Sequence, residues 1–359
     1  MMKRVLRVVL AALLAALALA ACSAAAETDG DCLYTLYDAQ GSVLTRRGGR
    51  IYVDDEYIAS SNACYRVVSV DDAAQTAVAE YTGMAGADRA ALSAFYALAE
   101  GDSKKLVAMY STHSDESYVP DDGESSKWEN AGIYDVGESL KEALEKRGIE
   151  TIYSKETFLP HDADAYSRSR RTAEELLKKG PDALLDIHRD AVPAEEYDAE
   201  VDGEDISKVR LFVGRSNPNA SANKAFAQQL KKAADEQYPG LVKDIFIGKG
   251  GYNQDIYPHS LLLEFGSHET NKDKAIASTD YMASVLDSVL FGGGAKGRGV
   301  GAGSAARGVG WVIGLAVIAA VVYAVATTGS HKGAGEKLRR HASELTGGLI
   351  GKKEDDRKG

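Results

Sequence analysis

The chain has 359 residues, enough for a catalytic domain and an accessory domain, and it carries a formal net charge of −11. Nucleic-acid-binding proteins need a basic face for the phosphates, so this acidic balance argues against a nucleic-acid partner.

Residues 1–22 have the pattern of a bacterial export signal. A basic segment, MMKRVLR, precedes an apolar stretch that runs into Leu19-Ala20-Ala21-Cys22. This ending resembles a lipobox, which predicts a lipid on Cys22; the alternative is an uncleaved N-terminal anchor. The exported part contains Cys32 and Cys64, and disulfide bonds persist outside the cytoplasm. The sequence leaves two alternatives: these cysteines form one disulfide bond with each other, or they remain two thiols.

Residues 23–82 are predicted to form a small, antiparallel, β-rich module. Short runs rich in Tyr, Val and Thr alternate here with turn residues, a spacing typical of strands joined by tight turns. The runs are CLYTLYD, SVLTR, RIYVD, EYIAS, CYRVVSV and TAVAEY. Residues 83–103 have helical periodicity and are expected to connect this module to the next domain.

Residues 104–291 alternate strand and helix patterns, which predicts an α/β domain with a sheet covered by helices. The clearest helix begins near Ile133, places Val136, Leu140 and Leu144 on one face, and is expected to end at Gly148. Apolar runs such as KLVAMY, DALLDIH, VRLFVG and SLLL have the length and composition of buried strands.

The C-terminal region predicts a membrane anchor. A Gly-rich linker at 292–308 leads to residues 309–327, an uncharged stretch long enough to span a bilayer as a helix. Residues 328–359 are basic, so the positive-inside rule places them in the cytoplasm and the catalytic part outside, at the cell membrane. A buried core helix is the alternative for residues 309–327.

Three of the apolar strands each run into an acid or a histidine. KLVAMY leads to His113 and Glu116, ALLDI ends at His188, and SLLL ends at Glu264. In an open α/β sheet, ligands bind at the carboxyl ends of the strands. Two histidines and a glutamate there can hold zinc with one position open, leaving a second glutamate to move protons. The pattern therefore predicts a zinc hydrolase.

Several segments in the same region resemble the stage II sporulation protein P family, which are zinc-dependent N-acetylmuramoyl-L-alanine amidases of the wider amidase-3 fold. The segments are STHSDESY, GESLKEALEKRGIETIYS, AYSRSRRTAEELL, LLDIHRDAVP and NQDIYPHSLLLEFGSHETN. The resemblance implies a mixed, mostly parallel sheet, a zinc cofactor, and cleavage of the amide between muramic acid and L-alanine in peptidoglycan. It also implies a role in sporulation or wall remodelling, with partner proteins of a wall-remodelling complex.

The resemblance assigns roles to individual residues. His113 and His188 match the family's zinc ligands, and Glu264 matches its catalytic glutamate. Glu116 is favoured as the third ligand because it lies three residues after His113 in the H-x-x-E-S-Y element. Glu129 competes, because a ligand glutamate precedes the first helix in the wider fold. A C-terminal membrane helix departs from the family's usual N-terminal anchor.

Other polar residues are candidates for contact with substrate. His161 and Arg168 lie in the loop LPHDADAYSRSR and could line the groove, and Arg189 could bind a carboxylate or stabilise an oxyanion. His259 and His268 flank Glu264 and are expected to have supporting or surface roles.

Two other functions fit the same residues. One is a non-catalytic lipoprotein that binds the cell wall, and the other is a zinc carboxypeptidase acting on stem peptides. If Glu264 is not the proton shuttle, Glu129, Glu269 and His268 are the next candidates.

Overall fold

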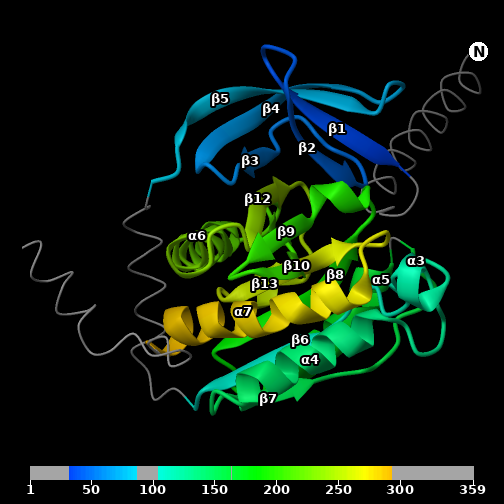
Figure 1. Ribbon diagram of the computed structural model, residues 1–359, viewed down its shortest axis with the longest axis vertical. Coiled ribbons are helices and arrows are strands. Elements are labelled where there is room, and N and C mark those ends of the chain that lie inside the picture. Colours follow the sequence, from blue (N-terminus) through cyan, green and yellow to red (C-terminus); the bar gives the residue numbers. More distant parts are fainter. Residues whose placement is uncertain (1–31, 87–103, 163, 293–359) are drawn as a thin grey trace, which may run out of the picture. The chain divides into compact units, whose positions relative to one another are not determined.

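The computed structural model describes residues 32–86, 104–162 and 164–292 (Figure 1). The expected export signal, the membrane helix at 309–327 and the basic tail lie outside these residues, as does most of the expected connecting helix. Within the described ranges, no helix combines the length and the apolar character that crossing a bilayer requires.

One mixed sheet of 11 strands runs through the described part of the chain, in the order β2-β1-β5-β4-β3-β12-β11-β13-β8-β6-β7 (Figure 1). A separate hairpin consists of β9 (Asp198–Val201) and β10 (Glu204–Ser207). The strands of the large sheet are β1 (Leu33–Asp38), β2 (Val43–Gly48), β3 (Glu56–Ile58), β4 (Ala63–Asp71), β5 (Thr76–Met84), β6 (Leu106–Tyr110), β7 (Glu150–Tyr153), β8 (Ala183–Asp190), β11 (Val209–Gly214), β12 (Val242–Gly248) and β13 (Ser260–Ser267).

From β12 to β7 the sheet is mostly parallel, as expected. Its pairs β12–β11, β13–β8, β8–β6 and β6–β7 are parallel, and β11–β13 is antiparallel. Parallel strands are covered on both faces, and β6, β8, β11 and β12 are accordingly buried almost throughout. Sequence reasoning did not assign β12, in which the adjacent charges of Lys243 and Asp244 shorten the apolar run that marks a buried strand.

Helices cover this half of the sheet on both faces. The helices are α3 (Val119–Asp122), α4 (Ile133–Glu145), α5 (Ala165–Leu177), α6 (Ala220–Gln237) and α7 (Lys272–Phe291), with short 3₁₀ turns η1 (Ala194–Glu196) and η2 (Gln254–Ile256). Helices α4, α6 and α7 share one hydrophobic core with Leu185, Ile187 and Leu263 of the sheet. Helix α5 packs on the opposite face, through a core that contains Leu176 and Leu184.

Helix α4 forms as its sequence predicts. Ile133, Val136, Leu140 and Leu144 recur at helical spacing and are all buried. The chain leaves the helix through Gly148, whose φ of +76° lies in the left-handed region that glycine adopts without steric cost. This helix packs against α7 and brings the chain from the loop that follows β6 to the edge strand β7.

The N-terminal strands belong to the same sheet as the α/β part, because β3 pairs antiparallel with β12. Five of the six expected runs form strands, while RIYVD does not. The expectation of a purely antiparallel module is wrong for one pair, since β1 and β5 are parallel. Strand β5 extends to Met84, beyond the expected end of the module at residue 82. Of the two alternatives for Cys32 and Cys64, the structure has two thiols and no disulfide bond.

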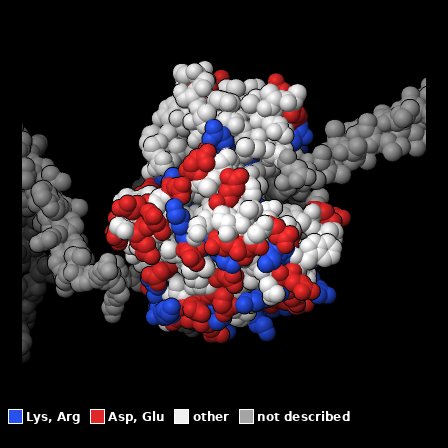
Figure 2. All heavy atoms as spheres, turned by 45° about the vertical axis from the view of Figure 1, so that its right-hand side comes forward, with Lys and Arg blue, Asp and Glu red and all other residues white. Residues whose placement is uncertain are grey.

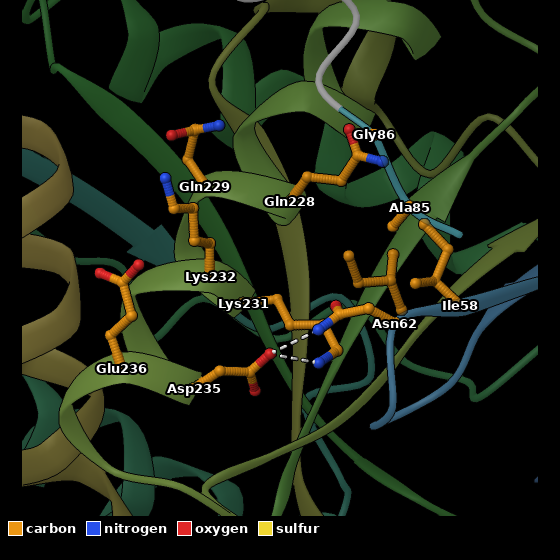
Figure 3. Close-up of a pocket in the computed structure, with 11 residues that line it drawn as sticks. Ile58, Asn62, Ala85, Gly86, Gln228, Gln229, Lys231, Lys232, Asp235 and Glu236 are labelled. Carbon is orange, nitrogen blue, oxygen red and sulfur yellow. Dashed lines mark hydrogen bonds and ion pairs between the residues drawn. The ribbon is translucent and has the colours of Figure 1, made fainter. Parts of the chain in front are cut away.

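A buried lysine fixes the turn between β3 and β4 to helix α6 (Figure 3). The side chain of Lys231 is 1% exposed, and its Nζ donates to Asp235 Oδ2 at 2.7 Å and to the Ser60 carbonyl at 2.9 Å. Asn62 Nδ2 donates to the same carboxylate oxygen at 3.2 Å. These bonds link the N-terminal strands to the α/β part at a second point, beside the β3–β12 pairing.

Charged residues are unevenly distributed on the face shown in Figure 2. Asp and Glu side chains are frequent over the lower, helix-covered part, and few charges lie over the N-terminal strands above it. Lys and Arg are interspersed among the acids there, so this face has no broad basic patch for nucleic acid.

Candidate metal centre and catalytic site

The three strands that carry the expected site residues are neighbours. Strands β13, β8 and β6 lie side by side and are parallel, so their carboxyl ends meet at one edge. His113 follows β6, His188 lies in β8, and Glu264 lies in β13 opposite His188 in the pairing register. The convergence expected from the sequence is therefore present in the fold.

His113, Glu116 and His188 form a buried cluster whose ligand atoms all lie within 4.8 Å of one another. Glu116 Oε1 is 3.3 Å from His113 Nδ1 and 3.4 Å from His188 Nδ1. Around a tetrahedral zinc ion with bonds of roughly 2.0–2.1 Å, neighbouring ligand atoms are roughly 3.3–3.4 Å apart. The spacing and the N, N, O donor set therefore fit zinc.

Backbone hydrogen bonds place Glu116 between the two histidines. Its N–H donates to the His113 carbonyl at 3.1 Å, which closes a turn and brings both side chains to one side. Its Oε2 accepts the Arg189 N–H at 2.8 Å, which ties the loop after β6 to β8. Burial acts to raise the pKa of Glu116, but the charges of His188 and Arg189 hold it well below its usual range. The competing residue, Glu129, is exposed on the following loop and lies outside the cluster.

A buried aspartate lies beside His188. Asp186 Oδ1 is 2.8 Å from His188 Nε2, an ion-pair contact without hydrogen-bond geometry, and Nδ1 is directed toward Glu116. Asp186 is itself fixed by the N–H and hydroxyl of Thr112, at 2.8 and 2.7 Å. Burial lowers the pKa of His188, yet Asp186 and Glu116 together raise it well above its ordinary value. A carboxylate that holds the second nitrogen of a ligand histidine is the usual support of a zinc site.

His161 reaches the cluster from the loop before α5. Its ring stacks on His113 with centroids 3.9 Å apart, and its Nδ1 is 3.1 Å from Asp115 Oδ1. The Nε2 atoms of His113, His161 and His188 are buried without a hydrogen-bond partner among the described residues. Buried polar atoms normally have partners, so these nitrogens indicate that a ligand completes the site.

Arg168 supports this loop and does not reach the cluster. Its Nε donates to the Phe158 carbonyl at 2.7 Å, and its Nη2 bonds the Pro160 carbonyl and the Asp162 carboxylate. The guanidinium group therefore holds the segment that carries His161.

A cavity of about 520 Å³ adjoins the cluster. Arg189 and His161 line it, and the guanidinium of Arg189 is held by the carbonyls of Ser117 and Ser125 at 3.3 and 2.9 Å. The other lining residues are Cys32, Leu33, Ser125, Ser126, Ala191, Val192, Pro193, His268 and Glu269. His259 lies at the opposite end of β13, where its Nδ1 is 3.0 Å from the Asp182 carbonyl.

Glu264 lies beside the cluster in a polar network that sequence reasoning missed. The Tyr197 hydroxyl is 2.9 Å from Glu264 Oε2, and Arg210 Nη1 is 3.9 Å from the same oxygen. Burial, followed by the nearby charge of Asp190, raises the pKa of Glu264 to about 8. The alternation of Asp186, His188 and Asp190 in β8 was the available signal, because residues two apart in a strand share a face.

Comparison with known proteins gives one family and several distant structures. The sequence model described as "Stage II sporulation protein P (SpoIIP)" matches residues 57–287. Stage II sporulation protein P of Bacillus subtilis (strain 168) is 29% identical over 207 residues, 52% of this chain and 52% of that protein. The chain therefore spans about half the length of this curated relative.

Two solved structures are similar to part of the chain, at low sequence identity and low TM-score. The N-acetylmuramyl-L-alanine amidase Ami1 of Mycobacterium smegmatis has 13% identity and a TM-score of 0.35, covering 53% of this chain and 99% of that one. The CwlD amidase of Clostridioides difficile, solved in complex with the GerS lipoprotein, has 10% identity and a TM-score of 0.36, covering 52% and 98%. The family match, by contrast, spans more than half of the chain and includes the whole His113–Glu116–His188 cluster and Glu264. The chain therefore belongs to the stage II sporulation protein P family.

Proposed function

We propose that this chain is a zinc-dependent N-acetylmuramoyl-L-alanine amidase that cleaves the amide between muramic acid and the stem peptide of peptidoglycan. The observation that carries the proposal is the buried His113–Glu116–His188 cluster, whose donor spacing fits zinc, with Glu264 on the adjacent strand. Membership in the stage II sporulation protein P family supports the same reading.

His113, Glu116 and His188 would hold the ion, and Asp186 would keep His188 in the ligating orientation. Zinc supplies a Lewis acid that polarises the amide carbonyl and makes water a stronger nucleophile. His161 and Arg189 line the adjoining cavity, where their nitrogen atoms can bind carbonyl or carboxylate oxygens of the stem peptide.

Glu264 would act as the proton shuttle. Its carboxylate takes a proton from the attacking water as the new C–O bond forms at the amide carbon. It then returns that proton to the nitrogen of L-alanine as the C–N bond breaks, so the products are a carboxylate on muramic acid and a free amine. Burial and the charge of Asp190 raise the pKa of Glu264 from its usual range toward neutrality, where a carboxyl group can both accept and return a proton.

The proposed site of action is outside the cytoplasmic membrane, where peptidoglycan lies. The export signal with Cys22 and the apolar stretch at 309–327 support this location, and both lie outside the described residues. A role in sporulation or wall remodelling, with partner proteins of such a complex, belongs to the same proposal and rests on the family.

Digestion of purified peptidoglycan by the zinc-loaded protein tests the activity. An amidase creates a free amine on L-alanine and leaves muramic acid intact, which mass spectrometry of the released products detects. Release of a terminal amino acid would instead indicate a carboxypeptidase, and binding without any product would indicate a non-catalytic wall-binding protein. Glu264→Gln is the matched control, because it keeps the side-chain size and removes the base.

A further inference from the structure

The carboxyl group of Glu264 is held by groups from outside its own strand. The hydroxyl of Tyr197, which directly follows η1, lies 2.9 Å from Glu264 Oε2 and 2.9 Å from Asp190 Oδ2. Tyr197 is fully buried, and the amine of Lys243 lies over its ring at 4.5 Å. A hydroxyl has one proton and can also accept, so Tyr197 donates to one of the two carboxyl groups and accepts from the other when that group is protonated. One oxygen atom therefore links Glu264 and Asp190.

Asp190 is anchored on both of its oxygens. Its Oδ1 accepts the backbone N–H groups of Gly48 and Ala191 at 2.9 and 2.8 Å. Its Oδ2 accepts from Arg210 Nη1 at 2.7 Å, and Arg210 is 0% exposed. The orientation of the Tyr197 hydroxyl therefore depends on a carboxylate that cannot rotate without breaking several buried bonds.

Strand β2 supplies much of this anchoring. Thr45 Oγ1 and the Arg46 carbonyl accept from Arg210 Nη2 at 2.7 and 3.0 Å. The Gly48 N–H bonds Asp190, and Arg46 forms an ion pair at 2.7 Å with Glu196, the residue before Tyr197. Strand β2 thus contacts Asp190, the cation Arg210 that pairs with it, and the residue before Tyr197.

The approach of β2 to the end of β8 leaves no room for a side chain at Gly48. A Cβ atom there would lie 2.6 Å from Ala191 Cβ and 2.9 Å from the Ala191 nitrogen. The backbone would have to shift at the point where Gly48 bonds Asp190. Gly86 offers a matched comparison, because a Cβ atom there meets nothing within 4 Å.

We propose that strand β2, acting through Asp190, and Tyr197 position the carboxyl group of Glu264, so that the N-terminal strands are part of the catalytic unit. This inference rests on the proposed amidase function, in which Glu264 moves the proton. The family match begins at Tyr57 and does not include β2, so the contacts of this chain carry the inference. Tyr197, Asp190 and Gly48 are positioning residues that act through Glu264.

The experiment compares Tyr197→Phe, Gly48→Ala and the control Gly86→Ala in the zinc-loaded full chain. Tyr197→Phe keeps the buried ring and removes only the hydroxyl. We expect kcat for peptidoglycan cleavage to fall about 10-fold or more, the effect of losing one hydrogen bond to a charged group. KM, zinc content and circular dichroism should stay at wild-type values. Gly48→Ala should lower kcat in the same way, and Gly86→Ala should not.

Crystal structures of the wild type and Tyr197→Phe give a readout that does not depend on activity. We expect the Glu264 carboxyl group to occupy one position in the wild type and to rotate or adopt several positions in the variant. An unchanged Glu264 position together with an unchanged kcat in both variants would overturn the inference. A wild-type protein that cleaves no peptidoglycan, but whose Glu264 moves in Tyr197→Phe, would reject the amidase function and leave the positioning role supported.

Discussion

Glu264 and His188 lie opposite each other on adjacent parallel strands, β13 and β8. Neighbouring strands are about 4.8 Å apart, so the register places a carboxyl group next to a candidate zinc ligand without either residue lying in a flexible loop. Sites carried on strands hold their geometry better than sites carried on loops. The relationship explains how residues 76 positions apart in the sequence can serve one reaction.

The metal cluster predicts which substitutions remove zinc. Each of the variants His113→Ala, His188→Ala and Glu116→Gln lacks one of the three protein ligands. Loss of a residue that only supports a ligand weakens metal binding by up to about 100-fold, so we expect zinc affinity to fall by at least that factor. Metal analysis of the purified variants after dialysis measures this. Glu129→Gln is the control: Glu129 is exposed, so this variant should retain full zinc content. Zinc loss in Glu129→Gln with retention in Glu116→Gln would reverse the assignment of the third ligand.

Asp186 should matter for zinc although it is not expected to bind the ion. Its Oδ1 lies 2.8 Å from His188 Nε2, and Asp186→Asn would remove the negative charge beside the ring. We expect zinc affinity about 10- to 100-fold weaker than in the wild type, with the fold intact. Competition with a zinc chelator gives the affinity, and an unchanged value would show that His188 needs no such support.

Glu264→Gln separates proton transfer from metal binding. The amide cannot accept the proton of water, so we expect kcat to fall on the order of 100- to 10,000-fold. Zinc content should remain near that of the wild type, because Glu264 is not part of the His113–Glu116–His188 cluster. Loss of metal together with activity would identify Glu264 as a ligand, and retention of both would place the base elsewhere.

The pH dependence of kcat/KM should report the ionisation of Glu264. A base acts in its ionised form, so activity should rise with pH as Glu264 loses its proton. Burial and the Asp190 charge raise its pKa from 4.5 to about 8, whereas bound zinc opposes the shift. We therefore expect the acid limb of the profile between these two values. An acid limb at or below 4.5 would contradict the raised pKa of Glu264.

Arg210 should be important for stability. It is fully buried and pairs with Asp190 and Asp244 at 2.7 Å each, so Arg210→Leu leaves two buried carboxylates without their cation. Removal of one partner from a buried ion pair costs about 3–5 kcal/mol of unfolding free energy. Arg66→Leu is the control, because its pair with Glu56 is half exposed and should contribute less than about 1 kcal/mol. Urea denaturation measures both values, and equal losses would contradict the role of burial.

The sequence by itself determined the elements that depend on local pattern. The helical periodicity of Ile133, Val136 and Leu140 predicted α4, and the apolar runs before His113, His188 and Glu264 predicted β6, β8 and β13. Because ligands bind at the carboxyl ends of parallel strands, the same runs predicted that these residues meet. Local periodicity and short motifs suffice for such features, since each depends on a few consecutive residues.

Only the tertiary structure decided which distant residues surround Glu264. Arg210 is 54 positions from Glu264, and Thr45 is 165 positions from Arg210, yet all belong to one buried network. The pairing of β3 with β12 makes the N-terminal strands continuous with the α/β sheet, and no local pattern encodes that pairing. Strand pairing and buried charge networks depend on how the whole chain packs, so the physical partners of a site residue emerge only when the fold is complete.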